Sequence, residues 1–143
     1  MAKMIFVNLP VSDLQRATAF YQAIGATKNE QFSDAAGSCM VFSETIHTML
    51  LTHDKFRQFT PKKIADANTT SEVLICVSAD SRQQVDDTVA AAGSAGGKAD
   101  PSPRQDYGFM YGRSFEDPDG HIWEVMWMDM EAAAKAAPET AAA

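Results

Sequence analysis

The segment Ile122–Met128 (IWEVMWM) reads as a strand that carries one carboxylate in an otherwise apolar run. Because side chains alternate along a strand, Glu124 shares a face with Met126, while the two tryptophans point the other way. Burying an unpaired carboxylate is costly, so Glu124 is predicted to hold a metal, meet a cation or hydrogen-bond donors, stay protonated or face a wet cavity. A structural role, with Glu124 paired to Arg113 or to a hydroxyl group in a barrel wall, stays open.

Other polar side chains could join Glu124 at a ligand site. Asn8 stands two residues after Phe6 on the first predicted strand and so shares its face, where the amide could orient a ligand carbonyl or be purely structural. Along residues 107–116, Tyr111 and Arg113 belong to an alternating aromatic stripe that contains one cation. Such a stripe could hold an anionic aromatic ligand, or form ordinary core with Arg113 at its rim.

The histidines are expected to lie outside such a site. His47 and His53 mark the two ends of a predicted strand and are expected to face solvent. His121 follows a turn directly, where a histidine is expected to form hydrogen bonds near the hairpin.

The elements that would position these residues occur twice along the chain. Residues 4–11 predict a strand, a capping box from Ser12 to Gln15 follows, and helical spacing continues over 13–24. Three short strands are predicted next, near 27–32, 38–43 and 47–53. The same order of elements returns after residue 72, and the turn sequence DPDG leads into the last strand. We therefore expect a degenerate internal repeat, with two unrelated halves as the alternative.

Composition limits the possible classes of protein. A chain of 143 residues with 45% hydrophobic and 22% charged residues is typical of one folded domain, which we place at 1–130. The polar segment 54–71 is expected to be a linker, and 131–143 an alanine-rich tail that frays. The formal charge of −7 disfavours a nucleic-acid partner. No apolar run is long enough to span a membrane, and two cysteines outside any CxxC pair favour reduced, buried thiols in the cytoplasm.

Together, VSDLQRATAFYQAIG after the first strand, FSDAAGSCMVFSE and the terminal SFEDPDGHIWEVMW resemble the vicinal oxygen chelate superfamily. This superfamily includes glyoxalase I, bleomycin-resistance proteins and extradiol dioxygenases, and the chain is most similar to short bacterial glyoxalase-like proteins described as predicted lactoylglutathione lyases. The resemblance implies an α+β fold in which two tandem βαβββ modules, about 4–53 and 72–130, form an eight-stranded open barrel-like sheet. It also implies a homodimer.

In the metal-dependent relatives, four strands each supply one metal ligand, and the resemblance places the last of these on Glu124. The other positions fall on Phe6, on Leu50 with a slip to Met49 or Leu51 possible, and on Leu74. None of these side chains can bind a divalent cation. We therefore predict no cofactor, with nickel, zinc, iron or manganese at Glu124 as the alternative.

Two functions follow from the resemblance. One is a lyase or isomerase that acts on a small carbonyl compound or a glutathione adduct, with Glu124 as general base. The alternative is a non-catalytic module of the bleomycin-resistance type that sequesters a small molecule. In either case the ligand-binding residues are expected to be Phe6, Asn8, Leu50, Leu74, Tyr111, Arg113 and Met126.

Overall fold

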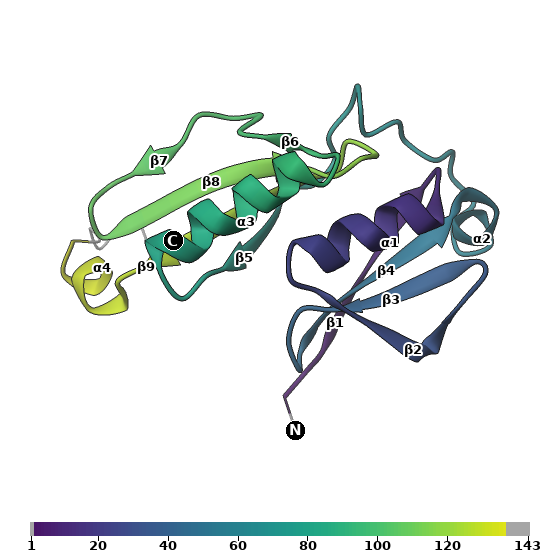
Figure 1. Cartoon of the computed structure of the whole chain (residues 1–143), viewed down its shortest axis with the longest axis horizontal. Helices are drawn as coiled ribbons and strands as arrows, with labels where there is room; N and C mark the ends of the chain where they lie inside the picture. Colours follow the sequence, from purple (N-terminus) through teal and green to yellow (C-terminus); the bar gives the residue numbers. More distant parts are fainter. Residues whose placement is uncertain (1, 137–143) are drawn as a thin grey trace.

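The computed structural model describes residues 2–136, which form two modules side by side (Figure 1). The first module contains β1 (Ile5–Val11), α1 (Leu14–Ala23), β2 (Thr27–Asp34), β3 (Gly37–Val41) and β4 (Ile46–Thr52). Its sheet has the order β1-β4-β3-β2, with β1 parallel to β4 and the remaining pairs antiparallel.

The second module repeats this plan with β5 (Ile75–Ser78), α3 (Arg82–Ser94), β6 (Lys98–Ala99), β7 (Gln105–Asp106), β8 (Met110–Glu116) and β9 (Ile122–Met128). Its sheet has the order β5-β9-β8-β6, and β7 also pairs with β8. The predicted α+β fold with two βαβββ-like units is confirmed. The strands form two separate sheets, however, and β6 and β7 contain only two residues each.

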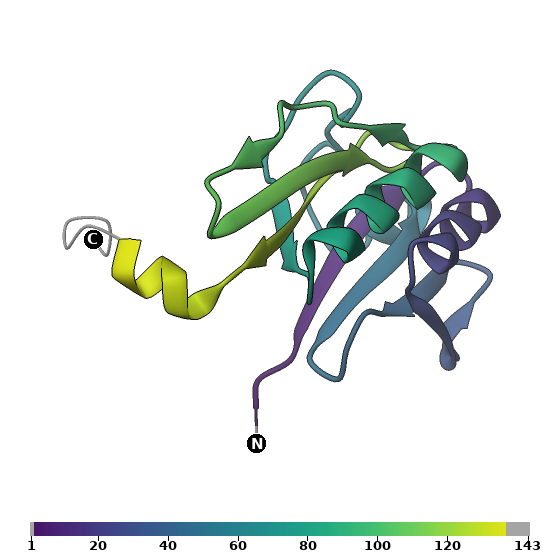
Figure 2. The same cartoon turned by 60° about the vertical axis from the view of Figure 1, so that its left-hand side comes forward.

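The linker and the tail each contain a short helix. α2 (His53–Arg57) opens the predicted linker, and α4 (Met130–Ala136) follows β9 and projects from the body of the molecule (Figure 2). The rest of the predicted tail, 137–143, lies outside the described residues. Within residues 2–136, no helix is long and apolar enough to cross a membrane.

Local side-chain contacts explain where the two long helices begin. Asp13 caps α1 by accepting a hydrogen bond from the Arg16 amide at 3.0 Å, so the cap is one residue later than the predicted Ser12. Ser81 caps α3 in the same way, through the Gln84 amide at 3.0 Å. Each cap satisfies an amide that the first turn of a helix leaves without a partner.

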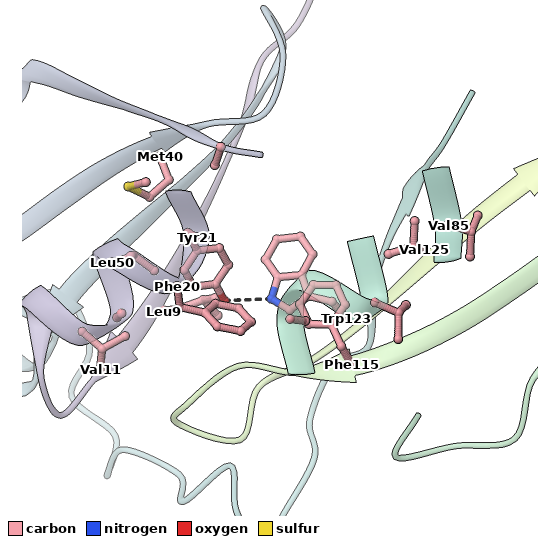
Figure 3. Packing of buried hydrophobic residues seen from close by; sticks show 14 of the residues in the cluster. Leu9, Val11, Phe20, Tyr21, Met40, Leu50, Val85, Phe115, Trp123 and Val125 are labelled. Atoms are coloured by element: carbon pink, nitrogen blue, oxygen red, sulfur yellow. Dashed lines mark hydrogen bonds between the residues drawn. The ribbon is translucent and has the colours of Figure 1, made fainter. Parts of the chain in front are cut away.

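One hydrophobic core joins the modules. Phe20 and Tyr21 of α1 reach the helix-facing side of the second sheet, where Phe115 and Trp123 are buried (Figure 3). The approach is so close at Gly97 that an added Cβ would collide with the ring of Phe20 and the carbonyl of Glu116. Glycine is therefore required there by the packing of one module on the other.

A buried polar network crosses the same core. The Trp123 indole donates to the Tyr21 hydroxyl at 2.9 Å, shown as the dashed line in Figure 3, and Tyr21 donates to Asp117 Oδ2 at 2.7 Å. Asp117 Oδ1 accepts from the amides of Asp119 and His121, each at 2.9 Å. Burial raises the pKa of Asp117, and burial followed by the charge of Asp117 raises that of Tyr21. The DPDG turn is thereby tied to α1.

Candidate functional site

Glu124 lies half-buried in a cavity of about 260 Å³ on the second sheet. Its cross-strand neighbours are Cys76 on β5 and Ser114 on β8, and Met126 lines the same cavity. Trp123 is fully buried on the opposite face of β9. The side chains of β9 therefore alternate between core and cavity, as the strand pattern predicts.

The two neighbours of Glu124 are neutral hydrogen-bonding groups. Cys76 is exposed, against the expectation that both cysteines are buried. Partial removal of the Cys76 thiol from water is the larger cause that raises its pKa, and the negative charge of Glu124 raises it further. The thiol therefore stays protonated near neutral pH and can donate a hydrogen bond, whereas a nucleophilic thiolate is disfavoured. The Ser114 hydroxyl accepts from the Ser102 amide at 3.2 Å, which leaves its own proton free to donate.

The proposed ion pair between Arg113 and Glu124 does not form. Arg113 lines the same cavity, but its guanidinium donates to Asp100 at 2.6 and 3.0 Å and to Asp86 on α3 at 2.9 Å. Hydrogen bonds from Arg113 lower the pKa of Asp100, and those from Tyr111 and then Arg113 lower the pKa of Asp86. Asp100 has a φ of +53°, an unfavourable conformation for a non-glycine residue, which the double contact with Arg113 helps to hold.

Tyr111 also belongs to this helix-facing cluster. Its hydroxyl donates to Asp86 at 2.6 Å, and the Arg82 guanidinium lies 4.9 Å from the centre of its ring. The stripe of Tyr111 and Arg113 therefore faces α3, where Asp86 and Arg82 contact it, and this arrangement favours the alternative of ordinary core over a surface for an anionic aromatic ligand.

The remaining predicted ligand residues lie apart from Glu124. Phe6 lines a different cavity on the first sheet, and Asn8 lines a third one near α2. Leu50 is fully buried in the core beneath α1, which corrects its predicted place on a cavity wall. Leu74 precedes β5 and is 57% exposed. Within one chain, the predicted residues that Glu124 meets in its cavity are Met126 and Arg113.

His47 is a cavity residue that the sequence prediction missed. It is 7% exposed and lies opposite Phe6 in the register of β1 and β4, so the expectation that it faces solvent was wrong. His47 lies an odd number of residues from Leu50, so the two side chains lie on opposite faces of β4. The face with His47 carries the cavity. His121 does form the expected type of contact, because its Nε2 lies 2.8 Å from the Pro10 carbonyl.

The residues at the family's metal positions do not fit a divalent ion. Phe6, Leu50 and Leu74 have no donor atom in their side chains, and Met49 and Leu51 offer neither imidazole nor carboxylate. Among residues 2–136, no three histidine, cysteine, aspartate or glutamate side chains are grouped as a metal site requires. Glu124 is thus a carboxylate whose oxygens can still accept hydrogen bonds, and it lies beside two neutral donor groups, Cys76 and Ser114.

Comparison with known proteins identifies the family of the chain. No curated protein matches the chain. A hypothetical protein from S. aureus is 23% identical with a TM-score of 0.73, covering 89% of this chain and 94% of its own. A glyoxalase/bleomycin resistance protein/dioxygenase family enzyme from Burkholderia phytofirmans is 20% identical with a TM-score of 0.71, covering 89% and 99%. A fosfomycin resistance protein from Listeria monocytogenes is 19% identical with a TM-score of 0.66, covering 92% and 97%.

These structures share the fold of the chain. The family match extends over residues 3–125, which include the first module, most of the second and Glu124. The chain therefore belongs to the Glyoxalase/Bleomycin resistance protein/Dioxygenase superfamily.

Proposed function

We propose that the chain is a metal-independent lyase or isomerase that acts on a small carbonyl compound or a glutathione adduct in the cavity around Glu124. The observation that carries the proposal is the carboxylate itself, which lines a cavity without the arginine partner that would neutralise it. A general base needs free acceptor capacity within reach of a ligand, and Glu124 has it.

The chemistry is a proton transfer next to a carbonyl group. Glu124 removes a proton from the hydroxyl-bearing carbon beside the carbonyl, and negative charge moves to the carbonyl oxygen. Glu124 then returns this proton to the former carbonyl carbon, while the hydroxyl proton passes to the former carbonyl oxygen, so that the first carbon becomes the new carbonyl. The thiol of Cys76 and the hydroxyl of Ser114, the residues that flank Glu124, donate hydrogen bonds to the developing oxyanion. An isomerisation of this kind is redox-neutral and needs no co-reactant.

The direct test is an assay of hemithioacetal and related carbonyl substrates after treatment with a chelator. We expect turnover to persist within about twofold, because each step uses the side chains around Glu124. Loss of turnover that added nickel, zinc, iron or manganese restores would contradict the metal-free mechanism.

A second candidate function is sequestration of a small molecule, and the apolar character of Phe6 and Met126 at the two cavities favours it. Tight ligand binding without turnover of any substrate in the same assay would select this function over the enzyme.

We also propose that two copies of the chain form a homodimer. β1 and β5 are edge strands of their sheets, and large apolar side chains are exposed at the start of each: Met4, Ile5 and Phe6 at β1, and Val73 and Leu74 at β5. Exposed apolar edges of this kind mark association surfaces.

Light scattering during size-exclusion chromatography is expected to give twice the chain mass of 15.5 kDa. Ile5→Lys should shift the protein towards monomer, because it places a charge at the apolar edge. Phe59→Lys is the matched control, since Phe59 is 67% exposed but lies in the segment after α2. A monomeric wild-type protein at about 100 µM, well above a typical micromolar dissociation constant, would contradict the dimer.

A further inference from the structure

A separate cavity, with a volume of about 520 Å³, lies between α2, the DPDG turn and the residue before the cap of α1. Residues 60–68, in the chain between α2 and β5, form one of its walls (Figure 1). This cavity shares no residue with the one around Glu124. Its volume is within the range of small-molecule sites. The segment predicted to be a linker therefore forms the wall of a cavity that can admit a small molecule.

Contacts with the DPDG turn fix this wall in place. Gly120 has a φ of +92°, and a Cβ added to it would collide with the Asn68 side chain and the Ala67 backbone. Asp66 orders the same stretch, because its Oδ1 accepts from the Asn68 amide at 3.0 Å and its carbonyl accepts from the Thr70 amide at 2.9 Å. The cavity is therefore largely formed without a ligand, which lowers the cost of binding one.

Basic side chains gather at this cavity, although the chain as a whole is acidic. Residues 53–63 contain four lysine and arginine side chains and one aspartate, whereas the formal charge of the chain is −7. Arg57, Lys62 and Lys63 line the cavity. Among the described residues, neither lysine forms an ion pair. Arg57 contacts the exposed Asp54 at 2.9 Å, which leaves other N–H groups of its guanidinium free.

The two carboxylates that also line the cavity do not cancel this charge. Asp119 Oδ1 lies 3.8 Å from Arg16 Nη2 and its Oδ2 is buried, so Arg16 offsets its charge. Asp54 offsets Arg57 in the same way. Two lysines then remain against Asp66, and the excess charge at the cavity is positive. A cleft lined by an excess of one sign attracts ions of the opposite sign.

We propose that this cavity binds a phosphate group, free or as the ester of a small molecule, through the ammonium groups of Lys62 and Lys63. A phosphate monoester carries close to two negative charges at neutral pH, which matches two lysines better than a single carboxylate does. Pro61 and Ile64 supply apolar surface for the uncharged part of an ester. This site goes beyond the proposed lyase or isomerase activity and does not depend on it.

Glucose 6-phosphate and glucose are matched probes, because they share one sugar and differ by the phosphate group. We expect a titration followed by NMR to show that glucose 6-phosphate shifts the amide resonances of residues 53–68 and that glucose does not. Inorganic phosphate is the third probe, and it distinguishes the two sources of the group. Weaker binding of inorganic phosphate than of glucose 6-phosphate would indicate an ester, and equal binding the free ion. Equal responses to glucose and glucose 6-phosphate, or no response to either phosphate at millimolar concentration, would overturn the assignment.

The double variant Lys62→Gln/Lys63→Gln should lower the affinity for glucose 6-phosphate by about tenfold, because it removes the two unpaired charges. Both lysines are exposed, so the variant is expected to fold. Lys55→Gln/Lys98→Gln is the matched control, since it changes the net charge equally at two residues outside the cavity. We expect it to change affinity less than twofold. Equal losses in the two double variants would show attraction by overall charge and refute the site. The readout is binding, so it is independent of turnover at Glu124.

Discussion

Glu124→Gln is expected to lower turnover of a carbonyl substrate by roughly 10²- to 10⁴-fold, the usual contribution of general acid–base catalysis. Glutamine has nearly the same shape as glutamate and lines the cavity in the same way, but its amide cannot accept a proton. Ligand affinity should therefore change by only a few-fold. Measuring kcat and KM together with a binding titration separates the two effects.

Glu116→Gln is the matched control for this experiment. Glu116 lies on β8 in the same sheet as Glu124, but it is outside the cavity and its carboxylate faces Lys98 at 3.9 Å. We expect it to leave turnover unchanged. Equal losses in the two variants would show that any loss of charge on this sheet reduces activity, which would remove the reason to assign the base to Glu124.

The sequestering function predicts a different result. A neutral amide is less costly to bury than a carboxylate, so Glu124→Gln would then leave binding intact and raise thermal stability or leave it unchanged. The presence or absence of turnover, measured beside binding and Tm, therefore distinguishes the two functions.

Much of the fold was predictable because local signals agree with the tertiary structure. The helices of 13–24 and of the second module follow from capping residues and apolar spacing, and the structure contains them as α1 and α3. Gly25, directly after the predicted helix of 13–24, has a φ of +110°, which glycine adopts without strain. The prediction that Glu124 and Trp123 lie on opposite faces of β9 was also correct, because the DPDG turn sets where β9 starts.

The faces of the other strands could not be predicted, because alternation groups residues without saying which group is covered. On β4, Leu50 was expected to line a cavity and His47 to face solvent, but Leu50 is buried in the core and His47 lines a cavity. The parallel pairing of β4 with β1 determines which face of β4 is covered. On β8, Tyr111 and Arg113 face Asp86 on α3, a partner about 25 residues away in sequence that no local pattern identifies. Long-range contacts therefore determine which polar residues are structural.

A large loss of stability is expected when the hydrogen-bond network that joins the modules is broken at Tyr21, which lies between Trp123 and Asp117. Tyr21→Phe should lower the free energy of unfolding by about 2–4 kcal/mol, because it leaves both the indole N–H and a carboxylate oxygen buried without a partner. Urea unfolding measures this loss. Tyr107→Phe is the control, because the Tyr107 hydroxyl also donates a hydrogen bond, to Gln105 Oε1, but the residue is 60% exposed and the change should stay within about 0.5 kcal/mol.

The pH dependence of this loss tests its cause. The Tyr21 hydrogen bond lowers the pKa of Asp117, opposing the larger effect of burial, so Tyr21→Phe should raise the folded-state pKa of that carboxyl group further. A group with a raised folded-state pKa stabilises the protein when protonated, and this stabilisation is lost as pH rises through that pKa. The difference between wild type and Tyr21→Phe should therefore be largest near pH 7 and shrink as Asp117 becomes protonated. A difference independent of pH, or a coupling energy near zero in a double-mutant cycle with Asp117→Asn, would assign the loss to packing of the tyrosine ring instead.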